Sequence, residues 1–134
     1  MLRDFFLGFI KVHILHHAAL EPVYGLALIQ ELRRHGYELG PGTLYPVLHA
    51  LERAGYLARE NRVVSGKVRK YYTITPTGLA ALEEARRKIR ELVSEVLEGV
   101  GPTRLPDTEE ALSRAESAAG RPRARGFQRR GGRR

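Results

Sequence analysis

The hydrophobic positions of the first twenty residues repeat with a helical period. Residues 4–19 carry apolar side chains around more than one face of the predicted helix, which exceeds the single stripe that a surface helix buries. These positions are Phe5, Phe6, Phe9, Ile10, Val12, Ile14 and Leu15. We therefore expect this helix to bury one side against its own domain and a second side against another surface, and to end at Glu21-Pro22.

Two further helices show the spacing of a single buried stripe. Residues 24–35 place Leu28, Ile29 and Leu32 toward the core, and Gly36 is a candidate C-cap. A third helix reaches about Ala54 and buries Leu44, Val47, Leu48 and Leu51. We expect Pro46 within about its first turn, where the missing N–H is not needed. The outward side of this helix then carries Thr43, Tyr45, His49, Ala50 and Arg53.

Residues 57–64 and 67–75 are rich in β-branched and aromatic side chains, which is typical of strands. The two residues between them, Ser65-Gly66, fit a tight hairpin turn. Thr75-Pro76 then supplies an N-cap and a first-turn proline for a fourth helix.

The fourth helix has the apolar spacing of a coiled-coil seam. Its apolar positions advance in steps of three and four, interrupted once by Arg86, and are Leu79, Leu82, Ile89, Val93, Val96 and Val100. Gly99, Gly101 and Pro102 end it. Beyond this point residues 107–119 predict only a weak helix, and the Gly/Arg-rich residues 120–134 are predicted to be disordered.

The order helix, helix, turn, helix, hairpin, helix predicts an α+β fold that is mainly α with a small β-hairpin. It is the arrangement of a winged helix-turn-helix followed by a C-terminal dimerisation helix. We assign residues 1–75 to the winged-helix domain, 76–100 to the dimerisation helix and 101–134 to a basic tail.

Charge favours a polyanionic partner. The 134 residues carry a formal charge of +8 and no cysteine, which excludes disulfides and thiolate zinc sites. Seven arginines and no acid lie in residues 120–134. The apolar segment 5–20 is too short to span a membrane and contains Lys11. We therefore expect a cytoplasmic protein that binds double-stranded DNA and no membrane.

Three segments resemble the PadR family of bacterial winged-helix regulators. They read LGFIKVHILHHA, VYGLALIQELRRHGYELGPGTLYPVLHALERAGYL and RKYYTITPTGLAAL. The resemblance implies a homodimer in which the first and last helices pack across the two-fold axis, usually to repress transcription. Gly40 departs from the serine that often precedes the Pro-Gly pair, and no tryptophan is present for the drug-binding mode of some relatives.

The candidate DNA-binding residues combine the family motifs with exposed basic and polar positions. They are Tyr24, Thr43, Tyr45, His49, Arg53, Lys67, Arg69 and Lys70. Arg53 is a candidate base reader, with pairing to Glu52 or phosphate as the alternatives. Purely structural packing is the alternative for the two tyrosines. The candidate dimer interface consists of Phe5, Phe6, Phe9, Ile89, Val93 and Val96.

Metal and enzyme chemistry are weakly supported by the sequence. His13 and His17 are spaced to chelate a metal ion from one helix face with His16 beside them, but further ligands would have to come from a partner subunit. We predict no metal, no cofactor and no catalytic residues, because nucleophile and phosphate-loop motifs are absent. Together with the basic helix-turn-helix and wing, the resemblance to the PadR family implies a homodimeric repressor that binds a near-palindromic operator and is released by a small-molecule effector of unknown identity. A protein-interaction module, or an RNA-binding protein using the arginine-rich tail, are the alternatives.

Overall fold

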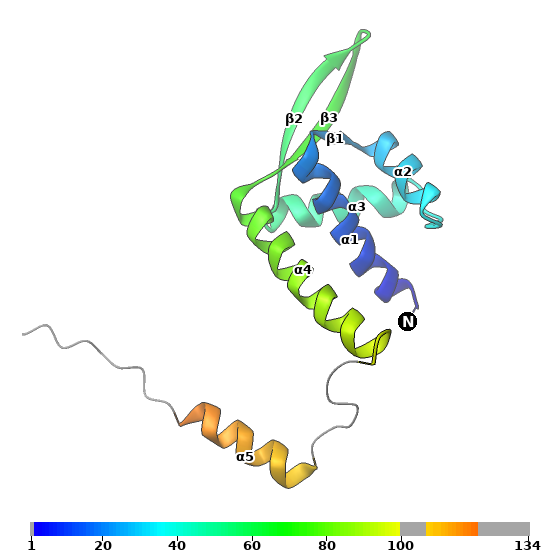
Figure 1. The fold of residues 1–134 in the computed structure, drawn as a ribbon. Helices are drawn as coiled ribbons and strands as arrows, with labels where there is room; N and C mark the ends of the chain where they lie inside the picture. Colours follow the sequence, from blue (N-terminus) through cyan, green and yellow to red (C-terminus); the bar gives the residue numbers. More distant parts are fainter. Residues whose placement is uncertain (1, 100–106, 121–134) are drawn as a thin grey trace, which may run out of the picture. The chain divides into compact units, whose positions relative to one another are not determined.

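The computed structural model describes residues 2–99 and 107–120, and it divides the chain into two compact units, residues 1–93 and 94–134. The elements of the first unit form a small helical domain with a projecting hairpin (Figure 1). Among the described residues, no helix has the length and hydropathy needed to cross a membrane.

The order of elements agrees with the predicted winged helix-turn-helix. The elements are α1 (Leu2–Leu20), β1 (Val23–Tyr24), α2 (Gly25–Arg34), α3 (Pro41–Arg53), β2 (Leu57–Val64), β3 (Lys67–Ile74), α4 (Pro76–Val96) and α5 (Thr108–Ala119). The strands form an antiparallel sheet in the order β1-β3-β2. The α+β fold and the hairpin are confirmed.

The short strand β1 was not predicted. Val23 pairs with Tyr72 and Tyr24 pairs with Tyr71, which ties the link between α1 and α2 to the hairpin. Two residues are too few to show an alternating pattern, so only the long-range pairing reveals this strand.

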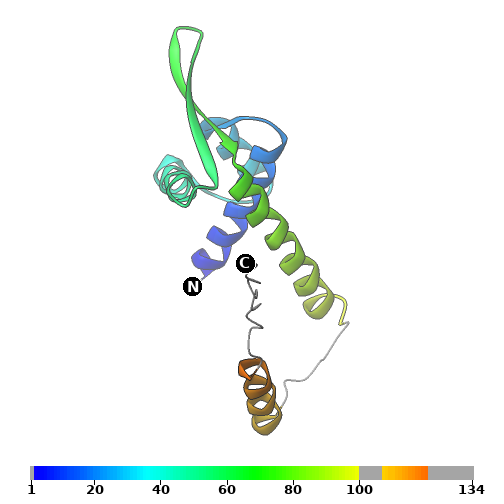
Figure 2. The same cartoon turned by 90° about the vertical axis from the view of Figure 1, so that its left-hand side faces the viewer.

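The core lies where α1, α2, α3 and the inner face of the sheet meet. The predicted stripes of α2 and α3 are buried as expected, together with Ile10, Ile14, Leu15, Ala18, Val23, Leu39, Leu57, Tyr72 and Leu82. The Tyr72 ring is fully buried, and burial raises the pKa of its hydroxyl. The wing, which we define as the β2–β3 hairpin, extends away from this core (Figure 2).

The turn at the tip of the wing has the backbone that its sequence predicts. Ser65 and Gly66 have φ values of 52° and 76°. Positive φ at both positions is the signature of the type I′ turn, whose twist matches that of the two flanking strands.

The start of α3 corrects the expected position of Pro46. Gly40 is the N-cap and makes no side-chain capping bond, while its carbonyl oxygen accepts from the backbone N–H groups of Thr43 and Leu44 at 3.1 and 3.0 Å. Because α3 begins at Pro41, Pro46 lies inside the helix in its second turn rather than in the first. The missing N–H of Pro46 leaves the carbonyl of Gly42 without its usual helical partner.

The start of α4 is held against the end of α3. The Thr75 hydroxyl caps α4 by accepting from the N–H of Gly78 at 3.0 Å, and it donates to the carbonyl of Gly55. The N–H of Thr75 also donates to the carbonyl of Tyr56 at 3.1 Å. The predicted cap is confirmed, and it joins the wing, α3 and α4 at one point.

The predicted seam of α4 is wrong at Leu82. That side chain is only 1% exposed because it packs into the core of its own domain. Val100 lies outside the described residues.

In the second unit, Asp107 caps α5 by accepting from the N–H of Glu110 at 2.9 Å, and no residue of α5 is buried.

We predict that Gly78→Ala strongly destabilises the domain. A Cβ at this position would lie 2.2 Å from the carbonyl oxygen of Tyr56, and backbone at this junction cannot move without breaking the Thr75 bonds. The expected loss in free energy of unfolding is about 2 kcal/mol or more. Gly42→Ala is the control, because a Cβ there meets nothing within 4 Å. Equal melting temperatures for the two variants, at one protein concentration, would contradict this account.

Candidate nucleic-acid interface

The exposed face of α3 lies opposite its buried stripe. His49 and Arg53 are exposed one turn apart on this face. Thr43 and Ala50 are half-buried, so the outward face is narrower than the sequence predicted. His49 and Arg53 therefore present hydrogen-bond donors to solvent on the side of α3 opposite its buried stripe.

Tyr45 packs against the start of α2. A Cβ at Gly25 would lie 2.6 Å from the Tyr45 hydroxyl oxygen, so only glycine leaves room for this ring. The tyrosine is nevertheless 36% exposed. It therefore serves the contact between the two helices of the helix-turn-helix and also presents an edge to solvent.

Arg59 lies beside the exposed face of α3, although the candidate set did not include it. Its Nε lies 3.8 Å from a Glu52 carboxylate oxygen, which links the base of the wing to α3. A shallow groove between the two elements is lined by Pro46, His49, Glu52, Arg53 and Arg59. Glu52 therefore pairs with Arg59 and not with Arg53, which makes no ion pair within the described residues. Period-two alternation from the buried Leu57 would have placed Arg59 on the inner face of the sheet.

The basic residues of the wing are divided between its two faces. Residues paired across antiparallel strands share a face, and successive residues alternate. Arg59 pairs with Tyr72, so Lys70, two residues before Tyr72, lies on the inner face that Arg59 shares with α3. Lys67 and Arg69 lie on the outer face. The structure therefore does not bring the three predicted wing cations into one cluster.

Aromatic rings hold two arginines on the outer face of the sheet. The guanidinium of Arg69 lies 4.8 Å from the centre of the Tyr24 ring, and that of Arg62 lies 4.8 Å from the Tyr71 ring. The two rings are themselves 5.4 Å apart. Such cation–π contacts restrict the arginines without neutralising them. Tyr24 thus has a clear packing role, and a contact of its hydroxyl with phosphate stays a prediction.

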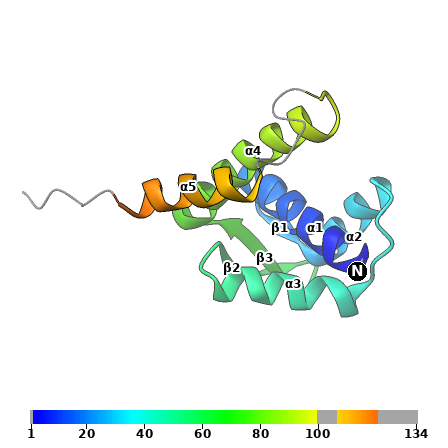
Figure 3. The same cartoon turned by 90° about the horizontal axis from the view of Figure 1, so that it is seen from below.

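Exposed apolar side chains gather on α1 and α4. Phe5, Phe6 and Phe9 are 60%, 46% and 47% exposed, and Ile89 is 41% exposed. Val93 is half-buried, Val96 is exposed, and Leu92, which was not predicted, is exposed as well. Seen from below, α1 lies between α3 and α4, so α4 and α3 are on opposite sides of the domain (Figure 3). The part of α4 that belongs to the first unit therefore lies on the other side of α1 from α3.

A histidine cluster lies between α1 and the end of α2. The candidate ligand atoms of His13, His17 and His35 all lie within 4.8 Å of one another. Burial lowers the pKa of His13 and His17, and the neighbouring imidazole of His35 lowers that of His13 further. The Glu31 carboxylate accepts a hydrogen bond from Arg34, which lowers its pKa. Sequence reasoning singled out the first two histidines but not His35, since only folding brings α2 beside α1.

Together these features define a class. A helix-turn-helix whose second helix presents an exposed polar face, followed by a basic two-stranded wing, is the architecture of winged-helix DNA-binding proteins.

Comparison with known proteins identifies the family. Residues 14–84 match the PadR-like family of transcriptional regulators. The transcriptional regulator Rv3488 of Mycobacterium tuberculosis is 53% identical over 102 residues, which cover 76% of this chain and 95% of that protein. The chain therefore belongs to the PadR-like family, whose members are transcriptional regulators rather than enzymes.

Solved structures show the same fold. A PadR family transcriptional regulator from Eggerthella lenta is similar with a TM-score of 0.63 at 35% identity, covering 72% of this chain and 85% of its own. A PadR-like transcriptional regulator from Bacillus cereus is similar with a TM-score of 0.62 at 32% identity, covering 66% and 88%. The resemblance inferred from the three sequence motifs is confirmed. The arginine-rich segment after Gly120 lies outside the described residues.

We predict that Tyr24→Phe separates the two roles of this residue. The variant keeps the ring contacts with Arg69 and Tyr71 and should melt at the wild-type temperature. Loss of one hydroxyl donor to phosphate should weaken binding of every duplex by about two- to tenfold, as expected for a single hydrogen bond. Fluorescence anisotropy with duplexes of differing sequence measures this effect. Unchanged affinity would leave Tyr24 a packing residue only.

Proposed function

We propose that this regulator binds duplex DNA as a homodimer and represses transcription from a near-palindromic operator. The observation that carries the proposal is the exposed face of α3, with His49 and Arg53 opposite a fully anchored stripe. An α-helix fits the major groove, and an arginine there can donate to both O6 and N7 of guanine. His49 and Arg53 are the proposed base readers.

The wing is proposed to contact the phosphates of the DNA backbone next to the bases that α3 reads. Lys67 near the tip and Lys70 on the inner face are exposed and can contact phosphates. Arg59, beside the groove next to α3, adds a third cation. Arg69 contributes from the outer face, where the Tyr24 ring holds it. Thr43 and Tyr45, at the start of α3, together with the Tyr24 hydroxyl, complete the proposed set of phosphate contacts. Such contacts position the protein and add affinity without reading sequence.

The homodimer is proposed to form through α1 and α4. The apolar side chains exposed there form the type of surface that a monomer rarely leaves in water. A two-fold pair would place its recognition helices about 34 Å apart, one helical turn of DNA. This explains the requirement for a near-palindromic site. Such a regulator acts in the cytoplasm, where bacterial DNA lies, and an effector releases it.

We predict that Arg53→Ala and Lys67→Ala weaken DNA binding in different ways. Loss of a base reader should cost about 1–3 kcal/mol on the operator and relax its sequence preference, whereas loss of a phosphate contact should weaken all sequences alike. Gel shifts with genomic fragments, followed by titration of the selected operator and a scrambled duplex, measure both effects. Four cationic phosphate contacts are proposed for each subunit, from Arg59, Lys67, Arg69 and Lys70. With both subunits bound, log K should therefore fall against log salt with a slope of about −7.

The charge-matched control is Lys88→Ala, which removes an exposed cation from α4 and should change neither affinity nor preference. If the protein were instead a protein-interaction module, it would select none of the genomic fragments in the gel shift. If it were an RNA-binding protein, RNA would compete for binding more strongly than duplex DNA. A flat salt response, or equal losses for all three variants, would refute the assignment of α3 and the wing.

We predict that Phe9→Glu converts a dimer into a monomer. The wild-type chain should sediment at twice its 15.1 kDa mass, and a carboxylate in the apolar contact should prevent association because it cannot be desolvated without a partner. Leu26→Glu is the matched control, since Leu26 is similarly exposed but lies on α2. Sedimentation equilibrium with circular dichroism tests this. A monomeric wild type, or a dimeric Phe9→Glu, would overturn the proposed interface.

A further inference from the structure

We propose that His13, His17 and His35, with the Glu31 carboxylate beside them, form a binding site for one divalent transition-metal ion of the Zn²⁺ type. Three imidazoles and a carboxylate are a common ligand set for such an ion. The expectation of no metal site considered only histidines of α1, and it assumed that any further ligand came from a partner subunit. His35 supplies that ligand from the same chain.

The geometry brings the donor atoms close to coordinating distance. The three ligand nitrogens lie within 4.8 Å of one another, and the rings of His13 and His35 stack with centroids 5.0 Å apart. Around a tetrahedral zinc ion with bonds of about 2.0–2.1 Å, neighbouring nitrogens are about 3.3 Å apart. Movements of roughly 1 Å, within reach of side-chain rotation, would therefore close the site.

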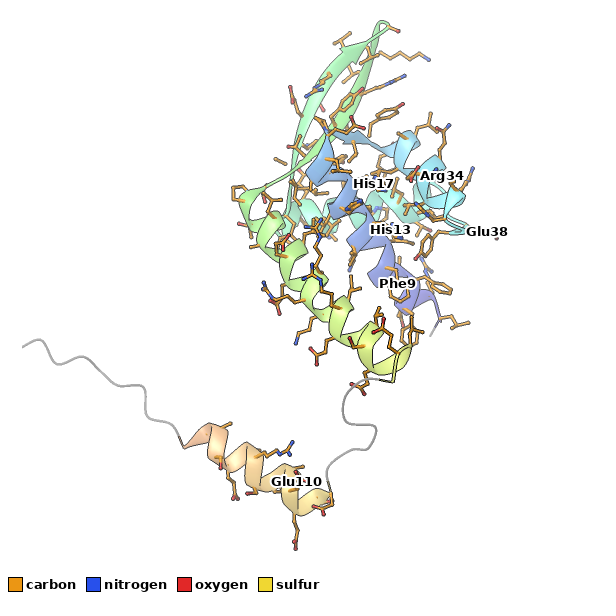
Figure 4. All side chains as sticks on the ribbon, in the orientation of Figure 1. Phe9, His13, His17, Arg34, Glu38 and Glu110 are labelled. Carbon is orange, nitrogen blue, oxygen red and sulfur yellow. The ribbon has the colours of Figure 1, made fainter. Side chains whose placement is uncertain are left out.

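Glu31 contacts one histidine of α1 and the histidine that follows α2. One of its oxygens lies 3.0 Å from Nε2 of His35 and 3.7 Å from Nε2 of His17. It can therefore act as a fourth ligand or hold the imidazoles in place. The same oxygen accepts from Arg34, whose side chain is 72% exposed and can turn into solvent when a cation enters. His13 and His17 are labelled on α1, with Arg34 on the neighbouring α2, in Figure 4.

Solvent access is compatible with entry of an ion. The side chains of His17 and His35 are 26% and 41% exposed. Histidines that merely completed the core would be closed off from water. His16, although adjacent in sequence, is exposed outside the group of three and is not one of its members.

The position of the site suggests that the ion influences DNA binding. This inference rests on the proposed function of α3 and α1 in DNA binding and dimerisation. His35 follows α2 directly and begins the turn that leads to α3, which Arg33 braces by donating to the carbonyl of Leu39 at 3.3 Å. His13 lies one turn from Phe9 of the proposed dimer surface. A metal ion would therefore tie the turn before the recognition helix to the helix that sets the spacing of the dimer. The ion is thus proposed as an effector of DNA binding.

The test of the site uses metal alone and the full chain. Isothermal titration of chelator-stripped protein with Zn²⁺ should show one ion per chain, and Zn²⁺ should raise the melting temperature. His13→Gln and His35→Gln should each weaken binding by at least tenfold. His16→Gln, the matched control, should stay within twofold of the wild type. No binding, or equal binding by all four proteins, would overturn the site, whatever the chain does with DNA.

A second measurement tests the effector role. Anisotropy with the selected operator should show a change of at least threefold in the DNA affinity of the wild type when Zn²⁺ is added, and no change for His35→Gln. Metal binding without an effect on DNA affinity would overturn the effector role. Failure of the chain to select any duplex would instead contradict the proposed function and leave the titration result intact.

Discussion

Burial of one stripe of α3 is the constraint on which the rest of this structure depends. Leu44 and Leu48 are completely inaccessible, and Val47 and Leu51 nearly so. Losing even one such side chain from the core costs about 2–5 kcal/mol, so the helix cannot rotate about its axis. His49 and Arg53 are consequently turned toward solvent by the packing behind them. The same hydrophobic contact stabilises the domain and presents the proposed recognition surface.

The wing inherits its orientation from the same core. Tyr72 is buried on the inner face of the sheet, and Thr75 bonds the end of the hairpin to Gly55, directly after the C-cap of α3. Since side chains alternate along a strand, burial of Tyr72 decides that Lys70 shares a face with Arg59 and that Arg69 does not. The Glu52–Arg59 ion pair then joins wing and helix into one surface.

α1 connects the different parts of the domain. One side of it enters the core through Ile10, Ile14 and Leu15, its first half exposes the phenylalanines, and His13 and His17 face the end of α2. Contact of the exposed phenylalanines with a dimer partner, as proposed, would account for the apolar positions beyond one stripe. If α1 contacts the core, a dimer partner and a metal ion, binding of the ion could change the distance between the α3 helices of the two subunits. The ion would then act on DNA binding without contacting DNA.

The sequence by itself determined the elements that depend on local patterns. The stripes of α2 and α3, the Ser65-Gly66 turn and the Thr75 cap were all predicted, because periodicity, positive φ and capping are properties of neighbouring residues. Only the tertiary structure decided the assignment of Leu82 to the core, the strand β1, the pairing of Arg59 with Glu52 and the meeting of His35 with His13. Each of these joins residues from different elements, and such contacts depend on how whole elements pack, which the pattern within one element does not specify.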